Sequence, residues 1–479
     1  MPIRRRTRLF PSLVVIGLLC ISPTVASAAM EACRGDCDLG NDVTVDEVLT
    51  LVSIAVGETD LGSCPVADRT CDGAVTVDEI IEAVSRALEG CEGSGRRGEL
   101  VVEASSAQGI LGTTSGGAVQ GGTPRMPPQY AVADPGEVSV SVYASGLKVP
   151  WAMQFSPDGR MFVTERPGRI RVIRDGQLES QPWATVSPLT EIGEGGLLGL
   201  ALHPEFPAEP YVYVCHTLTV GGEVQNRVVR YEEVDGHGVN PQPIVSGLPG
   251  SSVHNGCRLK FGPDGRLYIS TGDGGRRALS QDLSSLGGKI LRVNPDGSAP
   301  VDNPFPEAPR VWSLGHRNPQ GLAFQPRTGA LFETEHGPSG EVGVGAYDEL
   351  NRIEPGANYG WPAVVGAPGL AQYRDPLLTY PYPSGPLPPS GVSFYSGEAI
   401  AEWQGDLFFG SLGAEHLQRI GLDACGRIVG IERLYAGEYG RLRDVIGGPD
   451  GALYVSTSNR DGRGRPRSDD DRILRLAPR

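Results

Sequence analysis

One pattern of apolar and polar positions recurs along most of this chain. An apolar residue precedes a short polar turn, Pro-Asp-Gly in several copies, and a strand-like run follows in which apolar and polar residues alternate. Asp-Gly turns favour β-hairpins, and the alternation is the period of a strand with one buried face. The copies begin at Phe155, Leu202, Phe261, Phe324, Trp403 and Ile446.

The six copies predict an all-β, six-bladed β-propeller over residues 136–479. A β-sandwich is the alternative, although it has no need for the same hairpin in every copy. The composition agrees, because Gly (67) and Pro (40) are abundant and follow no collagen-like period, which favours turn-rich β-structure.

The patterning differs near the N-terminus, where residues 30–92 contain an internal repeat. The segment Val43–Val48 (VTVDEV) returns as Val75–Ile80 (VTVDEI), and each copy leads into an apolar pattern of helical period. An acidic loop that leads into a helix is half of an EF-hand. The repeat resembles a dockerin-like module and predicts a small α-helical, calcium-binding domain that serves attachment or spacing. A cohesin-type protein partner is one hypothesis for this domain.

The second loop of the repeat fits calcium. Calcium takes oxygen ligands at alternate loop positions and a carboxylate at the last, and Gly73 occupies the sixth position, where the chain turns sharply. The first loop fits less well: Gly40 offers no side-chain oxygen, so metal binding and a solvated acidic turn both stay open there. Positions one, three, five, nine and twelve of the second loop are Asp68, Thr70, Asp72, Thr76 and Glu79.

The segments on either side of this repeat have other patterns. A basic head, the apolar run Leu9–Ile21 and the small residues Ala26–Ala28 have the order of an export signal. We expect residues 1–28 to be a cleaved signal peptide and the protein to be secreted or periplasmic without a transmembrane anchor; an uncleaved anchor is the alternative. Residues 93–135 are rich in Gly, Ser, Thr, Ala and Pro, which is typical of a flexible linker.

Charge and cysteine content narrow the possible partners and the compartment. The net charge of −15 argues against a nucleic-acid partner, because phosphate binding needs a basic surface. Eight cysteines remain after the expected cleavage, and in an oxidising compartment we expect disulfides whose pairing the sequence does not fix. These cysteines are Cys33, Cys37, Cys64, Cys71, Cys91, Cys215, Cys257 and Cys425.

Candidate chemistry concentrates between Trp312 and Pro362. Charged and polar side chains stand there at the ends of strand-like runs, which is typical of a binding site built from loops. These residues are His316, Arg317, Asn318, His336, Asp348 and Glu349.

Two segments of this stretch resemble the soluble quinoprotein sugar dehydrogenases, also called the glucose/sorbosone dehydrogenase family. They are GHRNPQGLAF, which begins at Gly315, and GANYGWP, which ends at Pro362, and the resemblance covers residues 138–478. Members of that family use pyrroloquinoline quinone (PQQ) and calcium to oxidise the C1 hydroxyl of aldoses to lactones. The resemblance therefore implies an exported PQQ- and Ca2+-dependent dehydrogenase with a small-molecule aldose substrate and an unidentified electron acceptor.

The resemblance assigns a role to each matching residue. His254 stands at the family's catalytic histidine, and a neutral imidazole suits removal of a hydroxyl proton near neutral pH. Arg441 and Arg443 match an arginine pair whose planar guanidinium groups suit the carboxylates of PQQ. Arg317 would stabilise charge on the quinone as it is reduced, and Asn318 would hydrogen-bond the cofactor.

The resemblance also implies two calcium sites. Calcium at the cofactor acts as a Lewis acid, and its protein ligands would be the backbone carbonyls of Gly337 and Pro338. A second, structural calcium would use the carboxylate of Glu349 and a carbonyl near Tyr359.

Two positions depart from the family pattern. Glu194 stands where a glutamine commonly contacts substrate or cofactor, and its charge beside a tricarboxylate is unfavourable unless it is compensated or protonated. Gly413 replaces an expected cofactor-contacting lysine, with Glu415 nearby. These departures motivate an alternative, a non-catalytic propeller that has lost PQQ and binds a glycan or protein. A lactonase-like metal hydrolase is a third hypothesis, disfavoured because it would need several convergent Asp, Glu and Asn ligands.

Overall fold

The structure is a computed structural model that describes residues 37, 43–59, 63–64, 67–68, 74–89, 138–340, 343, 347–381, 387–423 and 426–479. The chain divides into one unit that ends at Ser105 and another that begins at Ser106. The predicted signal peptide and linker lie outside the described residues, so their boundaries stay predictions.

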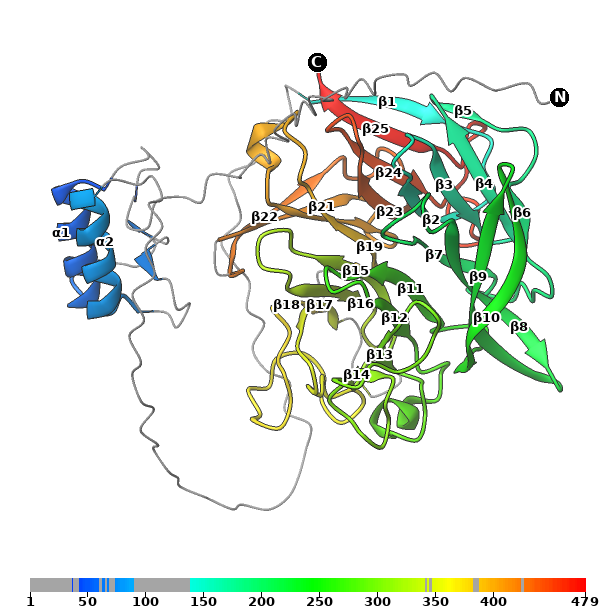
Figure 1. The fold of residues 1–479 in the computed structure, drawn as a ribbon, viewed down its shortest axis with the longest axis horizontal. Helices are drawn as coiled ribbons and strands as arrows, with labels where there is room; N and C mark the ends of the chain where they lie inside the picture. Colours follow the sequence, from blue (N-terminus) through cyan, green and yellow to red (C-terminus); the bar gives the residue numbers. More distant parts are fainter. Residues whose placement is uncertain are drawn as a thin grey trace, which may run out of the picture. The chain divides into compact units, whose positions relative to one another are not determined.

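The described part of the first unit contains two helices that contact each other, α1 (Val45–Ala55) and α2 (Val77–Glu89) (Figure 1). At the start of α1, the N–H of Thr44 donates to Glu47 Oε2 at 2.7 Å and the Thr44 hydroxyl accepts from the Glu47 N–H, a capping box. At the start of α2, the N–H of Thr76 donates to Glu79 Oε2 at 2.8 Å. The two copies of the repeat therefore place their Thr–Glu pairs equivalently.

The predicted calcium loop of this unit is described only in part. Asp68 and Glu79 are buried, whereas Thr70 and Asp72 lie outside the described residues, so calcium binding here stays a prediction. A disulfide joins Cys37 to Cys64. Among the helices described, none has the length and apolar composition needed to cross a membrane.

The described strands of the second unit form six antiparallel sheets, which confirms the predicted six-bladed β-propeller (Figure 1). The first two blades consist of β2 (Pro150–Phe155), β3 (Met161–Glu165), β4 (Arg169–Arg174), β5 (Gln177–Leu178) and β6 (Ala184–Thr185), and of β7 (Leu197–Leu202), β8 (Tyr211–Val220), β9 (Glu223–Val234) and β10 (His237–Pro249). The third and fourth consist of β11 (Gly256–Phe261), β12 (Leu267–Thr271), β13 (Lys289–Val293) and β14 (Val311–Leu314), and of β15 (Pro319–Phe324), β16 (Leu331–Glu335), β17 (Tyr347–Ile353) and β18 (Leu378–Pro381). The fifth and sixth consist of β19 (Pro389–Phe394), β20 (Leu407–Ser411), β21 (Leu417–Leu422) and β22 (Ile428–Leu434), and of β23 (Leu442–Gly447), β24 (Leu453–Thr457), β25 (Ile473–Pro478) and β1 (Val138–Ala144).

The first strand of each blade lines a central channel. Neighbouring first strands contact one another around a closed ring, in the order β2, β7, β11, β15, β19, β23 and back to β2. The sixth blade closes this ring with both ends of the unit, because β1 pairs with β25 from Val138 opposite Pro478 to Ala144 opposite Ile473.

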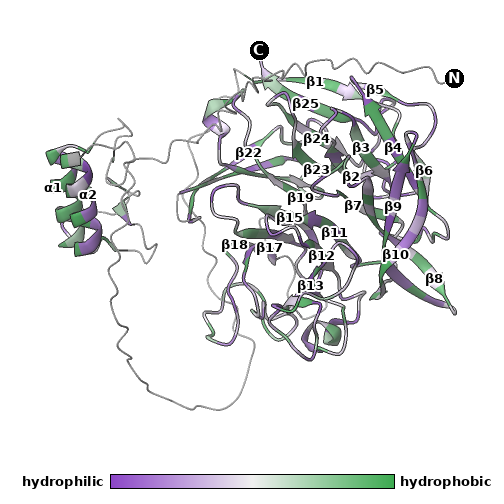
Figure 2. Ribbon diagram, in the orientation of Figure 1, coloured by the Kyte–Doolittle hydropathy of each residue, from purple (hydrophilic) through white to green (hydrophobic). Residues whose placement is uncertain are grey.

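The predicted hairpin turns follow the first strands, so they gather at one end of the channel. β2 ends at Phe155, β11 at Phe261 and β15 at Phe324, and each is followed by a predicted turn. The second strands β3 and β12 are buried along their whole length. In Figure 2, hydrophilic residues are frequent on β9, whose first and last residues are exposed. The starts of the first strands face the opposite end of the channel.

Candidate functional site

A cavity of about 1040 Å³ opens at the end of the channel where the first strands begin. A smaller cavity of about 230 Å³ adjoins it and shares several of its lining residues, Arg441 among them. Arg443 lines the smaller cavity. The predicted site residues on the larger cavity are Glu194, His254, Arg317, Asn318, Gly337, Pro338 and Arg441.

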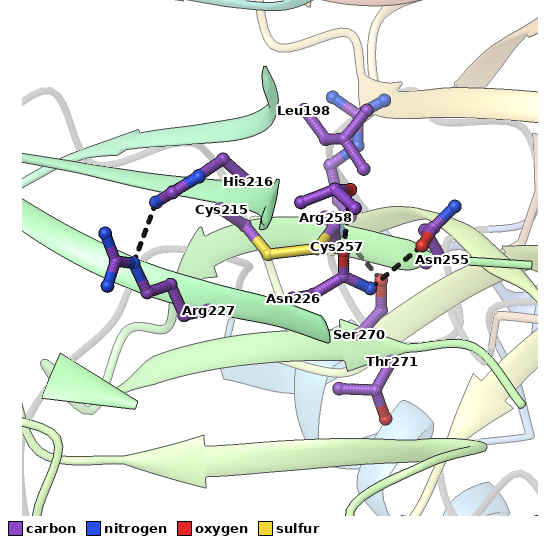
Figure 3. The surroundings of a disulfide bond; sticks show 12 residues. Leu198, Cys215, His216, Asn226, Arg227, Asn255, Cys257, Arg258, Ser270 and Thr271 are labelled. Atoms are coloured by element: carbon purple, nitrogen blue, oxygen red, sulfur yellow. Dashed lines mark hydrogen bonds between the residues drawn. A yellow bond between two sulfur atoms is a disulfide. The ribbon is translucent and has the colours of Figure 1, made fainter. Parts of the chain in front are cut away.

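His254 lies in the loop between β10 and β11, in the left-handed backbone region with a φ of 52°. This conformation costs a non-glycine residue about 1–2 kcal/mol, so neighbouring contacts must hold the loop. Asn226 of β9 donates to Asn255 Oδ1 at 3.0 Å and to the carbonyl of Pro249 at 2.9 Å (Figure 3). A Cβ on Gly272 would lie 1.9 Å from the His254 carbonyl oxygen, so only glycine fits beside the loop.

The imidazole of His254 is oriented by a buried carboxylate. His254 Nδ1 lies 2.7 Å from Asp273 Oδ1, and Asp273 is 1 % exposed. Trp361 Nε1 donates to Asp273 Oδ2 at 2.9 Å, and the Gly275 N–H donates to Oδ1 at 2.7 Å. Because a carboxylate accepts, Nδ1 carries the hydrogen, and Nε2 of the neutral ring is left as a proton acceptor.

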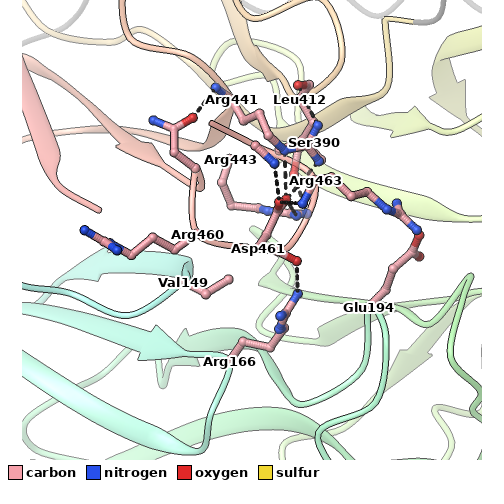
Figure 4. Close-up of polar contacts among 12 residues, drawn as sticks. Val149, Arg166, Glu194, Ser390, Leu412, Arg441, Arg443, Arg460, Asp461 and Arg463 are labelled. Atoms are coloured by element: carbon pink, nitrogen blue, oxygen red, sulfur yellow. Dashed lines mark hydrogen bonds and ion pairs between the residues drawn. The ribbon is translucent and has the colours of Figure 1, made fainter. Parts of the chain in front are cut away.

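Glu194 is paired rather than isolated. Its Oε1 lies 2.7 Å from Nη1 of Arg463, and its Oε2 accepts the backbone N–H of His254 at 3.1 Å (Figure 4). Burial alone would raise the pKa of Glu194, but the ion pair with Arg463 and the hydrogen bond from the His254 N–H lower it. The carboxylate is therefore ionised, and Arg463 compensates its negative charge. Compensation was the condition under which Glu194 could stand beside the carboxylates of PQQ.

Arg441 and Arg443 converge on one carboxylate. Arg441 Nη2 lies 2.8 Å and Arg443 Nη2 3.7 Å from Asp461 Oδ2 (Figure 4). Arg441 Nη1 also donates to the carbonyl of Leu412 at 2.9 Å, and Arg443 Nη1 donates to Gln320 Oε1 at 3.1 Å. Burial lowers the pKa of Arg443 to about 10, and its buried Nε has no partner among the described residues. Two guanidinium groups share one carboxylate, which leaves this wall positive.

Arg317 and Asn318 lie immediately before β15. Arg317 Nη1 donates to the carbonyl of His336 at 2.9 Å, and the guanidinium lies 5.5 Å from the ring centre of Trp361. Asn318 Oδ1 accepts the N–H of Gly256 at 3.1 Å, which ties β15 to the first residue of β11. Burial lowers the pKa of His336 to about 3, so this imidazole is neutral.

Gly337 and Pro338 follow β16 at the cavity wall. Asp348 Oδ1 accepts the Gly337 N–H at 2.9 Å, and Asp348 Oδ2 accepts the Leu387 N–H at 2.7 Å. Burial raises the pKa of Asp348 to about 6. A Cβ on Gly337 would lie 2.2 Å from the Tyr347 carbonyl oxygen, so glycine is required at this turn. Asp348 thereby fixes the orientation of the peptide between His336 and Gly337.

Glu349 and Tyr359 belong to a second cluster outside this cavity. Glu349 on β17 pairs across the strands with Glu335 on β16, and Asn351 pairs with Glu333. Ligand atoms of His316, Glu333 and Glu335 lie within 4.8 Å of one another. The ring of Tyr359 stacks on His316 with centroids 4.7 Å apart.

The carboxylates of this second cluster lack enough positive partners. Burial, followed by the charge of Glu335, raises the pKa of both Glu333 and Glu349 well above the usual range. Glu333 Oε1 and Asn351 Oδ1 are buried without a hydrogen-bond partner among the described residues. Oxygen atoms arranged in this way suit a hard divalent cation.

Several residues of the cavity were not predicted from the sequence. Each of them contacts a predicted site residue from another loop; they are Asp273, Trp361, Asp461 and Arg463. Gly413, where a lysine was expected, is exposed in the loop after β20, and its neighbour Leu412 lines the cavity instead. Arg463, whose side chain is 59 % exposed, brings a different cation to the cavity.

Comparison with known families matches residues 147–474 to the glucose/sorbosone dehydrogenase model. The chain belongs to the glucose/sorbosone dehydrogenase family. The match covers the propeller except for β1 and most of β25, and it includes every residue that lines the larger cavity. The predicted resemblance is confirmed.

Members of this family with known structures share the fold. A structure from Thermus thermophilus, assigned provisionally as an oxidoreductase (glucose dehydrogenase), is 48% identical, with a TM-score of 0.65, and covers 71% of this chain and 99% of its own. The PQQ-bound aldose sugar dehydrogenase of Streptomyces coelicolor is 36% identical, with a TM-score of 0.63, and covers 74% of this chain and 99% of its own. The aldose sugar dehydrogenase of Escherichia coli is 30% identical over 367 residues, which are 72% of this chain and 95% of the relative.

Proposed function

We propose that this protein is an exported, PQQ- and calcium-dependent dehydrogenase that oxidises the C1 hydroxyl of aldose sugars to lactones. One observation carries the proposal: His254, oriented by Asp273 at 2.7 Å, shares a cavity with Arg317, Asn318 and Arg441. A base and a set of anion-binding groups at one cavity are what proton removal beside an acidic cofactor requires.

The residues present fit PQQ. The cofactor carries three carboxylates, and the cavity wall has more guanidinium groups than carboxylates, with the buried Arg443 Nε still lacking a partner among the described residues. Arg441, Arg443 and Asn318 would hold it. When bound, PQQ with its calcium ion supplies the acceptor for the hydride that leaves C1.

The chain's own groups account for the proton. His254 Nε2 accepts the proton of the C1 hydroxyl, because Nδ1–H is committed to Asp273. The carboxylate of Asp273 stabilises the imidazolium that forms and keeps the ring in one orientation. Arg317 places a fixed positive charge at the cavity wall, where negative charge develops during the reaction.

Two calcium sites fit the residues present. At the cavity, Asp348 fixes the peptide N–H of Gly337, and the carbonyls of Gly337 and Pro338 would bind the cofactor's ion. At the second cluster, Glu349 with Glu333, Glu335 and a carbonyl near Tyr359 would bind a structural ion, because these buried carboxylates otherwise lack neutralising charge.

The compartment and the first unit complete the proposal. The disulfides Cys37–Cys64 and Cys215–Cys257 fit an oxidising compartment and therefore export. We retain for the first unit the proposal that its second loop binds calcium and that the unit attaches the enzyme to a protein partner.

The test is reconstitution of the mature protein with calcium and PQQ, followed by dye reduction with a panel of aldoses. We expect turnover that depends on PQQ and falls about 10²–10⁴-fold in His254→Ala, the range that a positioned general base supplies. His237→Ala, at an exposed histidine, is the matched control and should keep full activity. Full activity in His254→Ala would refute the assignment of the base.

The non-catalytic alternative keeps one supporting observation. Glu194 no longer argues against PQQ, because Arg463 pairs with it at 2.7 Å. Gly413 still leaves its own loop without the expected cation. Calorimetry with PQQ separates the two functions, since the alternative predicts no binding.

A further inference from the structure

The channel has a second opening, at the end where the hairpin turns gather. A cavity of about 690 Å³ lies there, lined by residues from the later parts of the first strands. A neighbouring cavity of about 670 Å³ shares Phe155, Lys260 and Phe324 with it. None of the residues assigned to PQQ or to proton transfer lines either cavity.

We call the cavity of about 690 Å³ the lower cavity, and the cavity that contains His254 the upper cavity. The inner wall of the lower cavity contains a buried ion pair and one hydrogen-bond donor without a partner among the described residues. Arg258 of β11 is 6 % exposed, and its Nη1 lies 3.0 Å from Asp444 Oδ1 of β23. Its Nε donates to the carbonyl of Gln320 at 2.8 Å, and its guanidinium lies 4.2 Å from the ring centre of Trp151. Nη2 is buried and has no partner among the described residues.

A second cation, Lys260, lines the same cavity two residues further along β11. In the described part of the chain, its ammonium has no hydrogen-bond partner and no carboxylate within 4.0 Å. The other two lysines differ, because Lys148 is exposed and Lys289 donates to three backbone carbonyls, the nearest at 2.7 Å. Lys260 therefore lacks the compensation that a largely enclosed charge normally has.

The acids of this cavity supply only part of that compensation. Asp444 is shared, since its Oδ1 meets Arg258 and its Oδ2 accepts the N–H of Met153 at 2.8 Å. Asp450 pairs with Arg475 at 2.7 Å, and Glu398 is exposed. The inner wall thus holds two cations and one carboxylate, an excess of one positive charge. Burial lowers the pKa of both Arg258 and Lys260, as expected for cations short of negative partners.

Part of the remaining wall is apolar, beside polar residues such as Ser396. Phe155, Phe324 and Phe394 end the first strands of three different blades and line the cavity together with Ile446. This apolar patch suits the apolar or aromatic body of a small ligand.

We propose that this lower cavity binds a small organic monocarboxylate. One negative charge equals the excess on the inner wall, the Lys260 ammonium is the donor for a carboxylate beside the Arg258 guanidinium, and the phenylalanines receive its apolar body. PQQ does not fit this description, because it would bring three carboxylates to an excess of one charge. The site is independent of the proposed dehydrogenase activity.

Isothermal titration of the full mature protein with benzoate tests the proposal. We expect one saturable site, with affinity about 10-fold or more weaker in Lys260→Met, because a charge-assisted hydrogen bond is lost. Lys260→Arg should keep the affinity, and Lys148→Met is the matched control that should not change it. Arg441→Gln, in the upper cavity, should also leave it unchanged, which separates this site from the PQQ site.

Two comparisons on the unaltered protein keep the proposal falsifiable if a variant fails to fold. Benzyl alcohol has the same body without the charge and should not bind, and chloride should displace benzoate only weakly. No benzoate binding, binding of benzyl alcohol as tight as that of benzoate, or chloride binding as tight as that of benzoate would each overturn the proposal. Unchanged affinity in a folded Lys260→Met would do the same.

Discussion

At the scale of single residues, the proposed chemistry depends on contacts that a carboxylate makes behind His254. Asp273 is held by the Trp361 indole and the Gly275 N–H, and it accepts the His254 Nδ1 hydrogen at 2.7 Å. The imidazole alone, in a loop of left-handed conformation, would have several orientations. Its fixed geometry comes from Asp273, which is therefore a positioning residue.

Replacing Asp273 by Asn should impair the reaction without preventing cofactor binding. We expect kcat to fall about 10- to 1000-fold, part of the 10²–10⁴-fold that a positioned general base provides. The acidic limb of the pH–rate profile should move to lower pH, because the imidazolium loses a neighbouring negative charge. Steady-state kinetics across pH, with PQQ affinity as the control, measures both. An unchanged profile would mean that Asp273 is only structural.

The pair of Glu194 and Arg463 should act as a unit toward PQQ. Arg463→Ala leaves Glu194 uncompensated beside the cofactor site, so we expect about 10-fold weaker PQQ binding by calorimetry. In a Glu194→Gln background the same substitution should cost less, with a coupling between about 0.5 and 3 kcal/mol. Additive effects of the two substitutions would show that the ion pair at 2.7 Å does not tune the site.

Sequence motifs located some of these residues and not others, for a physical reason. His254, Arg441 and Arg443 stand in local motifs, so their neighbours along the chain identified them. Asp273 lies 19 residues after His254, and Trp361 lies 88 residues after Asp273. Arg463 lies 269 residues after Glu194. Only the closed ring of blades brings such distant loops together, and no local pattern encodes that pairing.

At the scale of elements, the disulfide Cys215–Cys257 joins strands of two neighbouring blades. It connects β8 to β11 and closes a loop with a sequence separation of 42 (Figure 3). Cys257 lies three residues after His254, so the same strand carries the disulfide and ends the loop of the proposed base. We infer that the disulfide limits movement of that loop.

Removing this disulfide should lower both stability and activity. We expect Cys215→Ala/Cys257→Ala to lower the free energy of unfolding by about 2–4 kcal/mol, and to lower kcat as the His254 loop gains freedom. Denaturant unfolding and steady-state kinetics measure the two effects. Removal of Cys37–Cys64 is the matched control and should leave the propeller transition unchanged; equal effects of both removals would contradict this account.

The paired strands β16 and β17 present Glu333, Glu335 and Glu349 on one face. Calcium removal with EGTA should therefore lower the melting temperature, since an ion present at 100 times its Kd contributes about 2.7 kcal/mol. Glu349→Gln should lose most of this calcium dependence, whereas Glu398→Gln, at an exposed acid, should retain it. A calcium response unchanged in Glu349→Gln would place the ion elsewhere.

At the scale of the whole molecule, the propeller is closed by its own two ends. β1 contributes the outer strand of the sixth blade and pairs only with β25 among the described strands. The ring of first strands keeps the loops of the proposed site in register, so its closure is a condition for function.

Two truncations should separate this closure from the role of the first unit. Deletion of residues 1–136 should leave the propeller's melting temperature and activity close to those of the full chain. Deletion of residues 1–144, which also removes β1, should lower the melting temperature markedly and reduce activity. Thermal unfolding and dye-reduction assays make the comparison, and equal behaviour of the two truncations would refute the proposed closure.

The fold was largely predictable because its repeat is local. Each hairpin turn, such as those after Phe155 and Phe261, predicts one blade from its local sequence. The number of copies of the turn therefore predicts the number of blades. The closing strand β1 was not predictable in the same way, since its partner β25 lies at the other end of the domain. The lower cavity was missed because Arg258 and Lys260 resemble ordinary strand residues until the ring places them beside Asp444.

The most direct test of the central claim follows the carbon that is oxidised. The full mature protein, reconstituted with PQQ and calcium, would be given [1-¹³C]glucose and a dye acceptor, and the product read by ¹³C NMR. The account predicts that the anomeric signal is replaced by that of a lactone or its acid, only when PQQ is present, and that His254→Ala abolishes the change. An unaltered anomeric signal, with no PQQ retained on the protein after gel filtration, would contradict it.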